Sequence, residues 1–137
     1  TALMKAIYSD YNVEVIKVLI EAGARINARN DDGWTPLHIA TISGTFSDKI
    51  VKMLIEGGAE LNARDIADFT PLMYAAKRII KSDTEFTEIL EVIKALLNAG
   101  ADGRLKSRVG KTAFDYARDN PAIKDTKAYW LLNDARF

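Results

Sequence analysis

A repeated motif limits which folds this 137-residue chain can adopt. The residues T-P-L-H-I-A at 35–40 recur as T-P-L-M-Y-A at 70–75, and more loosely as T-A-F-D-Y-A at 112–117 and T-A-L-M-K-A at 1–6. The four threonines lie 34, 35 and 42 residues apart, and a Gly-Ala pair recurs with the same last two steps. Because the threonine motif and the Gly-Ala pair recur independently at the same spacing, the chain is predicted to consist of four similar units.

Each unit is predicted to contain two helices. Thr35 and Thr70 are favourable N-cap residues, because a hydroxyl can accept a hydrogen bond from a free N–H of the first helical turn, and a proline suits the position that follows. Glycines at 23, 58 and 100 fall where a left-handed residue ends a helix. Apolar residues at helical spacing mark the second helices: Val15, Ile16, Val18, Leu19, Ile50, Met53, Leu54, Ile89, Val92, Ile93, Leu96 and Leu97.

These motifs resemble the ankyrin repeat, a β-turn and two antiparallel helices with a period near 33 and the motif T-P-L-H-x-A. The resemblance implies an all-α fold with short β-hairpin turns, in which helix–turn–helix units stack into a solenoid. One domain over 1–137 is expected, with repeats at about 1–29, 30–64, 65–106 and 107–137.

The first and last repeats are predicted to be caps. Lys5 stands where the other repeats have Ile39, Tyr74 and Tyr116, which are expected to touch a neighbouring repeat. The residues G-K-T-A-F-D at 110–115 resemble the form common in C-terminal ankyrin caps. Pro121 is expected to start the final helix, and Trp130 is expected to lie in the hydrophobic core.

The third repeat carries an insertion of about nine residues within 77–88. Apolar stripes on both sides predict that both of its helices are lengthened and meet near 82–84, where Ser82 and Glu85 match a capping box. This repeat is expected to project beyond its neighbours, with a small core of Ile79, Ile80 and Phe86. The insertion is interpreted either as extra contact surface or as a tolerated loop insertion.

Composition excludes several kinds of site. The chain has no cysteine, which excludes disulfides, thiolate metal sites and a cysteine nucleophile, and its one histidine excludes a multi-histidine metal site. No cofactor is expected. Balanced charge, 19 basic and 19 acidic residues, argues against nucleic-acid binding, and the apolar runs are too short to span a membrane. A cytoplasmic location is favoured, with a secreted or periplasmic one left open.

The resemblance implies a non-catalytic protein-interaction module or scaffold. His38 is implied to hydrogen-bond within the hairpin and helix start rather than to act as a base. The partner would be another protein, bound on the concave face formed by hairpin tips and inner helices. The candidate contacts are Tyr8, Asp31, Asp32, Trp34, Ile42, Ile66, Phe69, Lys77, Arg78, Arg108 and Lys111.

Trp34 and Phe69 are the leading candidates, because aromatic anchors dominate binding hot spots. The competing interpretation is that they pack on each other and brace the hairpins. Charge is also uneven: residues 1–69 carry a net −3 and residues 70–137 a net +3. The alternative function is a structural unit that forms a homodimer through the insertion or the Trp34 surface, although a monomer is favoured. Asn27 and Asn62 are predicted to brace the turns.

Overall fold

A computed structural model describes residues 1–9, 12–43 and 47–137. The described residues form eight helices and no strand, which confirms the all-α prediction. The helices are α1 (Ala2–Tyr8), α2 (Val13–Glu21), α3 (Pro36–Ile42), α4 (Ser47–Glu56), α5 (Pro71–Lys77), α6 (Asp83–Ala99), α7 (Ala113–Arg118) and α8 (Lys127–Asp134).

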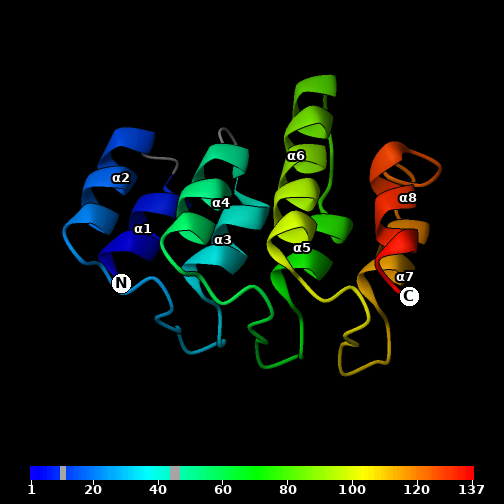
Figure 1. The fold of residues 1–137 in the computed structure, drawn as a ribbon, viewed down its shortest axis with the longest axis horizontal. Helices are drawn as coiled ribbons and strands as arrows, with labels where there is room; N and C mark the ends of the chain where they lie inside the picture. Colours follow the sequence, from blue (N-terminus) through cyan, green and yellow to red (C-terminus); the bar gives the residue numbers. More distant parts are fainter. Residues whose placement is uncertain (10–11, 44–46) are drawn as a thin grey trace.

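The helices form four antiparallel pairs that stand side by side in chain order (Figure 1). Within the stack, α1, α3, α5 and α7 pack on one another, and α2, α4, α6 and α8 form a second layer in the same order. The long connections between pairs turn at one edge of the stack (Figure 1). This is the arrangement expected when no single pair can bury its own apolar face.

Local capping explains where the inner helices begin. The hydroxyl of Thr35 accepts from the backbone N–H of His38, Thr70 from Met73 and Thr112 from Asp115. Gly23, Gly58 and Gly100 have φ angles of 84°, 90° and 106°, the left-handed conformation predicted just past the outer helices.

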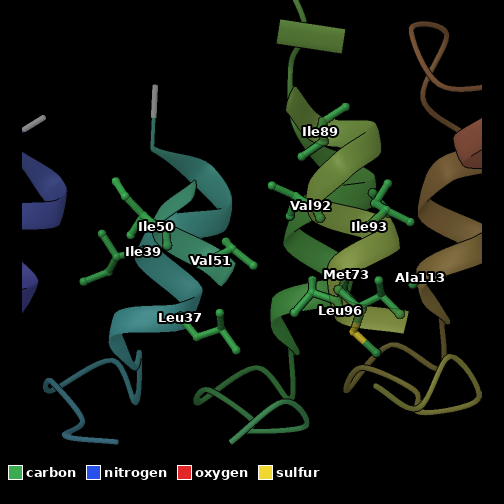
Figure 2. Packing of buried hydrophobic residues seen from close by; sticks show 14 of the residues in the cluster. Leu37, Ile39, Ile50, Val51, Met73, Ile89, Val92, Ile93, Leu96 and Ala113 are labelled. Carbon is green, nitrogen blue, oxygen red and sulfur yellow. The ribbon is translucent and has the colours of Figure 1, made fainter. Parts of the chain in front are cut away.

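The core runs through the whole stack rather than filling one centre. Buried side chains occur in successive pairs, as Figure 2 shows for Leu37, Ile50 and Val51 of α3 and α4 and for Met73, Val92 and Leu96 of α5 and α6. Each repeat therefore depends on its neighbours for burial of its apolar residues.

Each connection between pairs contains a short hairpin, and neighbouring hairpins form backbone hydrogen bonds with one another. Each closes with a backbone bond from residue i to residue i+4: Asn30 to Trp34 at 3.0 Å, Asp65 to Phe69 at 3.1 Å and Ser107 to Lys111 at 2.9 Å. Neighbouring tips are then joined, Ile66 N–H to Asp32 C=O at 3.1 Å and Arg108 N–H to Ala67 C=O at 3.0 Å. The tips therefore form a continuous edge.

The second of these hairpins places a non-glycine residue in the left-handed region. Gly33 and Gly110 have φ of 78°, and Asp68 at the equivalent position has φ of 59°. A non-glycine residue is strained in this backbone conformation. The Arg64–Asp68 ion pair at 3.7 Å is exposed and therefore stabilises the fold little.

We expect Asp68→Gly to raise the free energy of unfolding by about 0.5 kcal/mol, because glycine adopts this conformation without the clash of a Cβ. Urea denaturation measures the change. Gly110→Asp is the matched control and should lower stability by about 1 kcal/mol, since an added Cβ there meets no atom within 4 Å and only the backbone conformation is at stake. A less stable Asp68→Gly variant would contradict the prediction.

The third repeat differs in part from its prediction. Helix α6 is lengthened to 17 residues and rises above its neighbours (Figure 1), but α5 keeps the 7 residues of α1 and α3. The chain leaves α5 in an extended conformation at Arg78, where the Asn120 side chain donates to the Ala76 and Arg78 carbonyls at 3.0 Å each. These bonds satisfy carbonyls that a longer helix would have used itself.

The predicted private core is correct only in part. Ile80 and Phe86 are half-buried against the main core, but Ile79 is 77% exposed. Ser82 caps α6 by accepting from Glu85 N–H at 3.2 Å, while the Glu85 carboxylate accepts from Lys81 N–H rather than closing the capping box on Ser82. In an extended link, alternate side chains point to opposite sides, so Ile79 and Ile80 cannot both be buried.

The last helix also begins later than predicted. Residues 121–125 form turns, and α8 starts at Lys127 after the N-cap Thr126. Asp125 has a φ of 62°, which ends any helical run from Pro121. Trp130 is 54% exposed rather than a core residue, since the neighbouring Tyr129 takes the place against Phe114, with ring centroids 4.9 Å apart.

Asn27 and Asn62 reach further than their own turns. Asn27 Oδ1 accepts from the Glu60 N–H at 2.8 Å, and its amide donates to the Gly58 carbonyl at 3.1 Å. Asn62 Oδ1 accepts from the Asp102 N–H at 2.8 Å in the same way. Each asparagine therefore ties its hairpin to the end of the next helix pair.

Candidate functional site

A groove of about 380 Å³ lies between α1, the first hairpin and α3. Met4 and Tyr8 of α1 line one side, and Trp34 and Ile39 line the other. Tyr8 is 75% exposed, so its ring is available to a ligand without any rearrangement. The groove brings together Tyr8, Trp34 and Asp32 of the predicted contacts.

A row of aromatic rings continues from this groove across three repeats. Trp34 packs on Tyr74, Tyr74 on Phe69 and Phe69 on Tyr116, with centroid separations of 5.2, 5.1 and 4.9 Å. Trp34 and Phe69 come from hairpins, whereas the two tyrosines come from inner helices. Trp34 and Phe69 both pack on Tyr74 and thus brace adjacent repeats through this shared ring. These three rings are half-buried and Tyr116 is buried, so the interpretation of Trp34 and Phe69 as binding contacts stays a prediction.

The Asp65 carboxylate holds this row in place. It is only 7% exposed, and its Oδ2 accepts from Trp34 Nε1–H at 3.1 Å and from the Tyr74 hydroxyl at 2.5 Å. Its Oδ1 accepts from the backbone N–H groups of Ala67 and Phe69 at 2.8 and 2.9 Å. One carboxylate thus fixes a hairpin, the next inner helix and the preceding tryptophan.

These bonds also set the protonation of the pair. Burial raises the pKa of Asp65, but the bonds from Tyr74, Phe69, Ala67 and Trp34 outweigh it, so the net pKa is below its ordinary value. Burial and the adjacent carboxylate raise the pKa of Tyr74. The tyrosine therefore remains the donor and the aspartate remains ionised near neutral pH.

His38 lies beneath the row with both ring nitrogens in use. Its Nδ1 accepts from the Thr35 N–H at 3.1 Å, and its Nε2 lies 3.0 Å from the Phe69 carbonyl of the next hairpin. Because Nδ1 accepts, Nε2 carries the proton and donates. Burial lowers the pKa of His38, which keeps the imidazole neutral in this structural role.

A second pocket, of about 370 Å³, lies at the other end of the row. Lys77, Lys111, Tyr116 and Asp119 line it together with Asn120 and Pro121. The ammonium groups of Lys77 and Lys111 both lie 5.7 Å from the centre of the Tyr116 ring, and that of Lys77 is also 5.4 Å from Phe69. Lys111 is paired with Asp119 at 2.7 Å.

The hairpin tips carry the remaining predicted contacts. Asp31 and Asp32 are exposed on the first tip and Ile66 is exposed on the second. The guanidinium of Arg108, on the third tip, donates to the Ile66 carbonyl. The exposed edge therefore changes from acidic through apolar to basic along the chain.

Two predicted contacts are poorly placed for binding. Arg78 is 9% exposed, because its guanidinium turns inward and donates to the Ser47 hydroxyl at 2.9 Å. Ile42, in the last turn of α3, is half-buried rather than free. Arg78 is a correction to the predicted site: it joins two repeats.

Asp65, Tyr74 and Tyr116 organise the row but are not among the predicted contacts. A signal was present, because Asn30, Asp65 and Ser107 all lie five residues before a motif threonine. At each of these positions a polar side chain braces its hairpin or inner helix: Asn30 Oδ1 accepts from Trp34 N–H at 2.8 Å, and Ser107 Oγ lies 2.8 Å from the Tyr116 hydroxyl.

Other kinds of site find no support in the part of the chain that the structure describes. Within residues 1–9, 12–43 and 47–137, no group of three or more histidine, aspartate or glutamate side chains is arranged to hold a metal ion. No helix over the same ranges has the length and apolar character of a membrane span.

Comparison with known families decides what this stack is. A family model for ankyrin repeats in three copies matches residues 1–65, and a model for a single ankyrin repeat matches residues 68–107. The chain belongs to the ankyrin-repeat family. Ankyrin repeats generally mediate protein–protein interactions.

Two curated relatives each match about a third of this ankyrin-repeat chain. Protein phosphatase 1 regulatory subunit 27 of Mus musculus is 49% identical over 43 residues, which cover 31% of this chain and 27% of the relative. Notch-regulated ankyrin repeat-containing protein of Homo sapiens is 46% identical over 44 residues, which cover 32% and 38%. The matched stretch spans less than two fifths of either relative.

Proposed function

We propose that this ankyrin-repeat chain binds a segment of another protein on its concave face without catalysing a reaction. The aromatic row carries the proposal: four rings connect a groove beside Tyr8 to a pocket beside Lys77, and both ends are open. Stacked repeats present such preformed surfaces, which lowers the entropic cost of binding. The names of the two relatives, a regulatory subunit and an ankyrin-repeat protein, agree with this role.

The chemistry of the face supports binding rather than catalysis. His38 uses both ring nitrogens for structural bonds, so it is not a free base. Asp65 is saturated by four donors and has no lone pair directed at a ligand. The carboxylates and ammonium groups of the face are thus used for positioning and for charge.

We expect the double variant Tyr8→Ala, Ile66→Ala to weaken partner binding at least about tenfold, since both side chains are exposed on the proposed face and truncating a hot spot costs more than about 1.4 kcal/mol. Affinity purification from lysate of cells that express the protein, followed by quantitative mass spectrometry, measures the capture. Thermal melting should change little, because neither side chain is in the core.

The control is Val18→Ala, an equally exposed apolar residue on α2 in the outer layer. A protein retained by the wild type and by the control but lost from the double variant is the expected partner. If every captured protein is retained by the double variant, the concave face is not the binding surface.

Self-association is the second candidate, and the exposed Ile79 beside the long α6 is the observation that favours it. Light scattering over a concentration series from micromolar to millimolar distinguishes the two. A constant monomer mass removes this candidate, whereas a dimer that is lost in Ile79→Ser would support it.

A further inference from the structure

The two ends of the aromatic row differ in charge. At the end near Lys77, two ammonium groups converge on the Tyr116 ring, and Lys111 alone is neutralised by an aspartate. Over residues 1–9, 12–43 and 47–137, no carboxylate is paired with Lys77. The pocket of about 370 Å³ therefore holds one uncompensated positive charge above an aromatic floor.

The opposite end is mainly apolar. Met4, Tyr8, Trp34 and Ile39 supply most of the groove of about 380 Å³. Asp32 and Lys5, which also line it, have opposite charges. Such a groove suits an aliphatic or aromatic side chain, which gains free energy on leaving water.

The row fixes the distance between these ends. Three ring-to-ring steps of about 5 Å join Trp34 to Tyr116, so the centres of these two rings lie at most about 15 Å apart, and the groove and the pocket extend beyond them. About five residues of an extended chain, or about ten of a helix, span that distance.

We propose that the bound segment carries an Asp or Glu side chain that inserts between Lys77 and Lys111 and an apolar side chain that fills the groove beside Tyr8 and Trp34. This inference rests on the proposed function and names the chemistry of its partner. The Lys77 ammonium, which is held over two rings, would gain the charge-assisted hydrogen bond that the chain itself does not supply. The partner of this chain is thus a peptide segment with an acidic residue and one apolar anchor.

The probe is a phage-displayed library of random dodecapeptides selected on the full chain. Sequences that bind should pair an acidic residue with an apolar one at the spacing of an extended or helical segment. The best peptide, made synthetically, should bind Lys77→Glu at least about tenfold more weakly. Replacing its acidic residue by lysine should restore binding to Lys77→Glu and weaken binding to the wild type.

Lys124→Glu is the matched control, because it makes the same change in net charge at an exposed residue outside the row. This variant should bind the peptide with an affinity within about twofold of the wild type. Raising the salt concentration should lower the affinity of the wild type for the acidic peptide. Tyr8→Ala tests the apolar end separately.

Three results would overturn the inference: selected peptides without an acidic residue, equal binding to Lys77→Glu, or equal loss with Lys124→Glu. If such peptides still need Tyr8, the concave face binds protein segments but the acidic preference is wrong. If no selected peptide depends on Tyr8 or on Lys77, the proposed function fails as well.

Discussion

Asp65→Ala is expected to lower the free energy of unfolding by about 3 kcal/mol or more. The change removes the acceptor of two side-chain and two backbone donors at a position that is nearly buried. Unsatisfied buried donors each cost about 1–3 kcal/mol, and partial access of water reduces the total. Urea denaturation followed by far-UV circular dichroism gives the value.

Asn30→Ala is the matched control, because Asn30 occupies the same position one repeat earlier. Among residues 1–9, 12–43 and 47–137, its side chain accepts only from the backbone N–H groups of Asp32 and Trp34, and Asn30 is exposed. Its loss should cost about 1 kcal/mol. Equal effects of the two substitutions would show that the bonds from Trp34 and Tyr74 contribute nothing.

Asp65→Asn separates charge from shape. Asparagine keeps an oxygen for the backbone donors of Ala67 and Phe69, but its amide opposes the Trp34 N–H. We expect an intermediate loss, together with a shift in the tryptophan fluorescence of Trp34. An unchanged emission spectrum in a Trp130→Phe background, where Trp34 is the remaining tryptophan, would contradict the positioning role.

His38 is expected to give the second large effect. His38→Ala removes a fully buried ring that links Thr35 to the Phe69 carbonyl. The cavity and the unsatisfied Thr35 N–H together should cost about 3 kcal/mol, while the Phe69 carbonyl keeps its bond from the Asp65 N–H. Urea denaturation at pH 7.5, where the imidazole is neutral in both the folded and unfolded states, isolates this loss.

The same residue should make stability depend on pH. The pKa of His38 in the folded chain lies below its ordinary value of about 6.5, so the unfolded chain binds a proton first as the pH falls. The stabilisation is therefore complete above about pH 6.5 and is lost progressively as the pH falls through that value toward the folded pKa. We expect the midpoint of urea unfolding to decrease between pH 7.5 and 5.

Carboxylates do not obscure this window. The pKa values of Asp65, Asp115 and Glu91 are lowered by their hydrogen bonds and ion pairs against the opposing effect of burial, so their contributions are lost only at more acid pH. The His38→Gln variant should be less stable than the wild type at pH 7.5, but its midpoint of urea unfolding should stay nearly constant down to pH 5. A variant with the same slope as the wild type would assign the dependence to another group.

The sequence was most informative where a single local interaction decides the structure. Thr35, Thr70 and Thr112 cap their helices through bonds to residues three positions on, and the glycines at 23, 58 and 100 end the outer helices. Such interactions lie within one repeat, so spacing and residue type are sufficient to predict them.

Errors arose where the deciding contact comes from another repeat. Nothing near Arg78 in the chain indicates that Ser47 will accept its hydrogen bond, or that Asn120 will hold the carbonyls that end α5. Trp130 was predicted to be buried because it is a large aromatic residue, but Tyr129 takes the place against Phe114 and Trp130 is exposed. The predicted contacts at Trp34 and Phe69 stay predictions, and their link through Tyr74 and Asp65 depends on how the repeats are stacked.

The sequence by itself determined the repeat, the helix pairs, the turns between them and the ankyrin-repeat family. The tertiary structure alone decided which side chains meet across repeats: the aromatic row, the Asp65 bonds and the two lysines over Tyr116. The physical reason is the range of the interactions. Capping and periodicity act over three or four residues. The contacts that cross repeats, such as Trp34–Asp65, Trp34–Tyr74 and Phe69–Tyr116, join residues about 30 to 50 positions apart and exist only once the apolar faces have stacked.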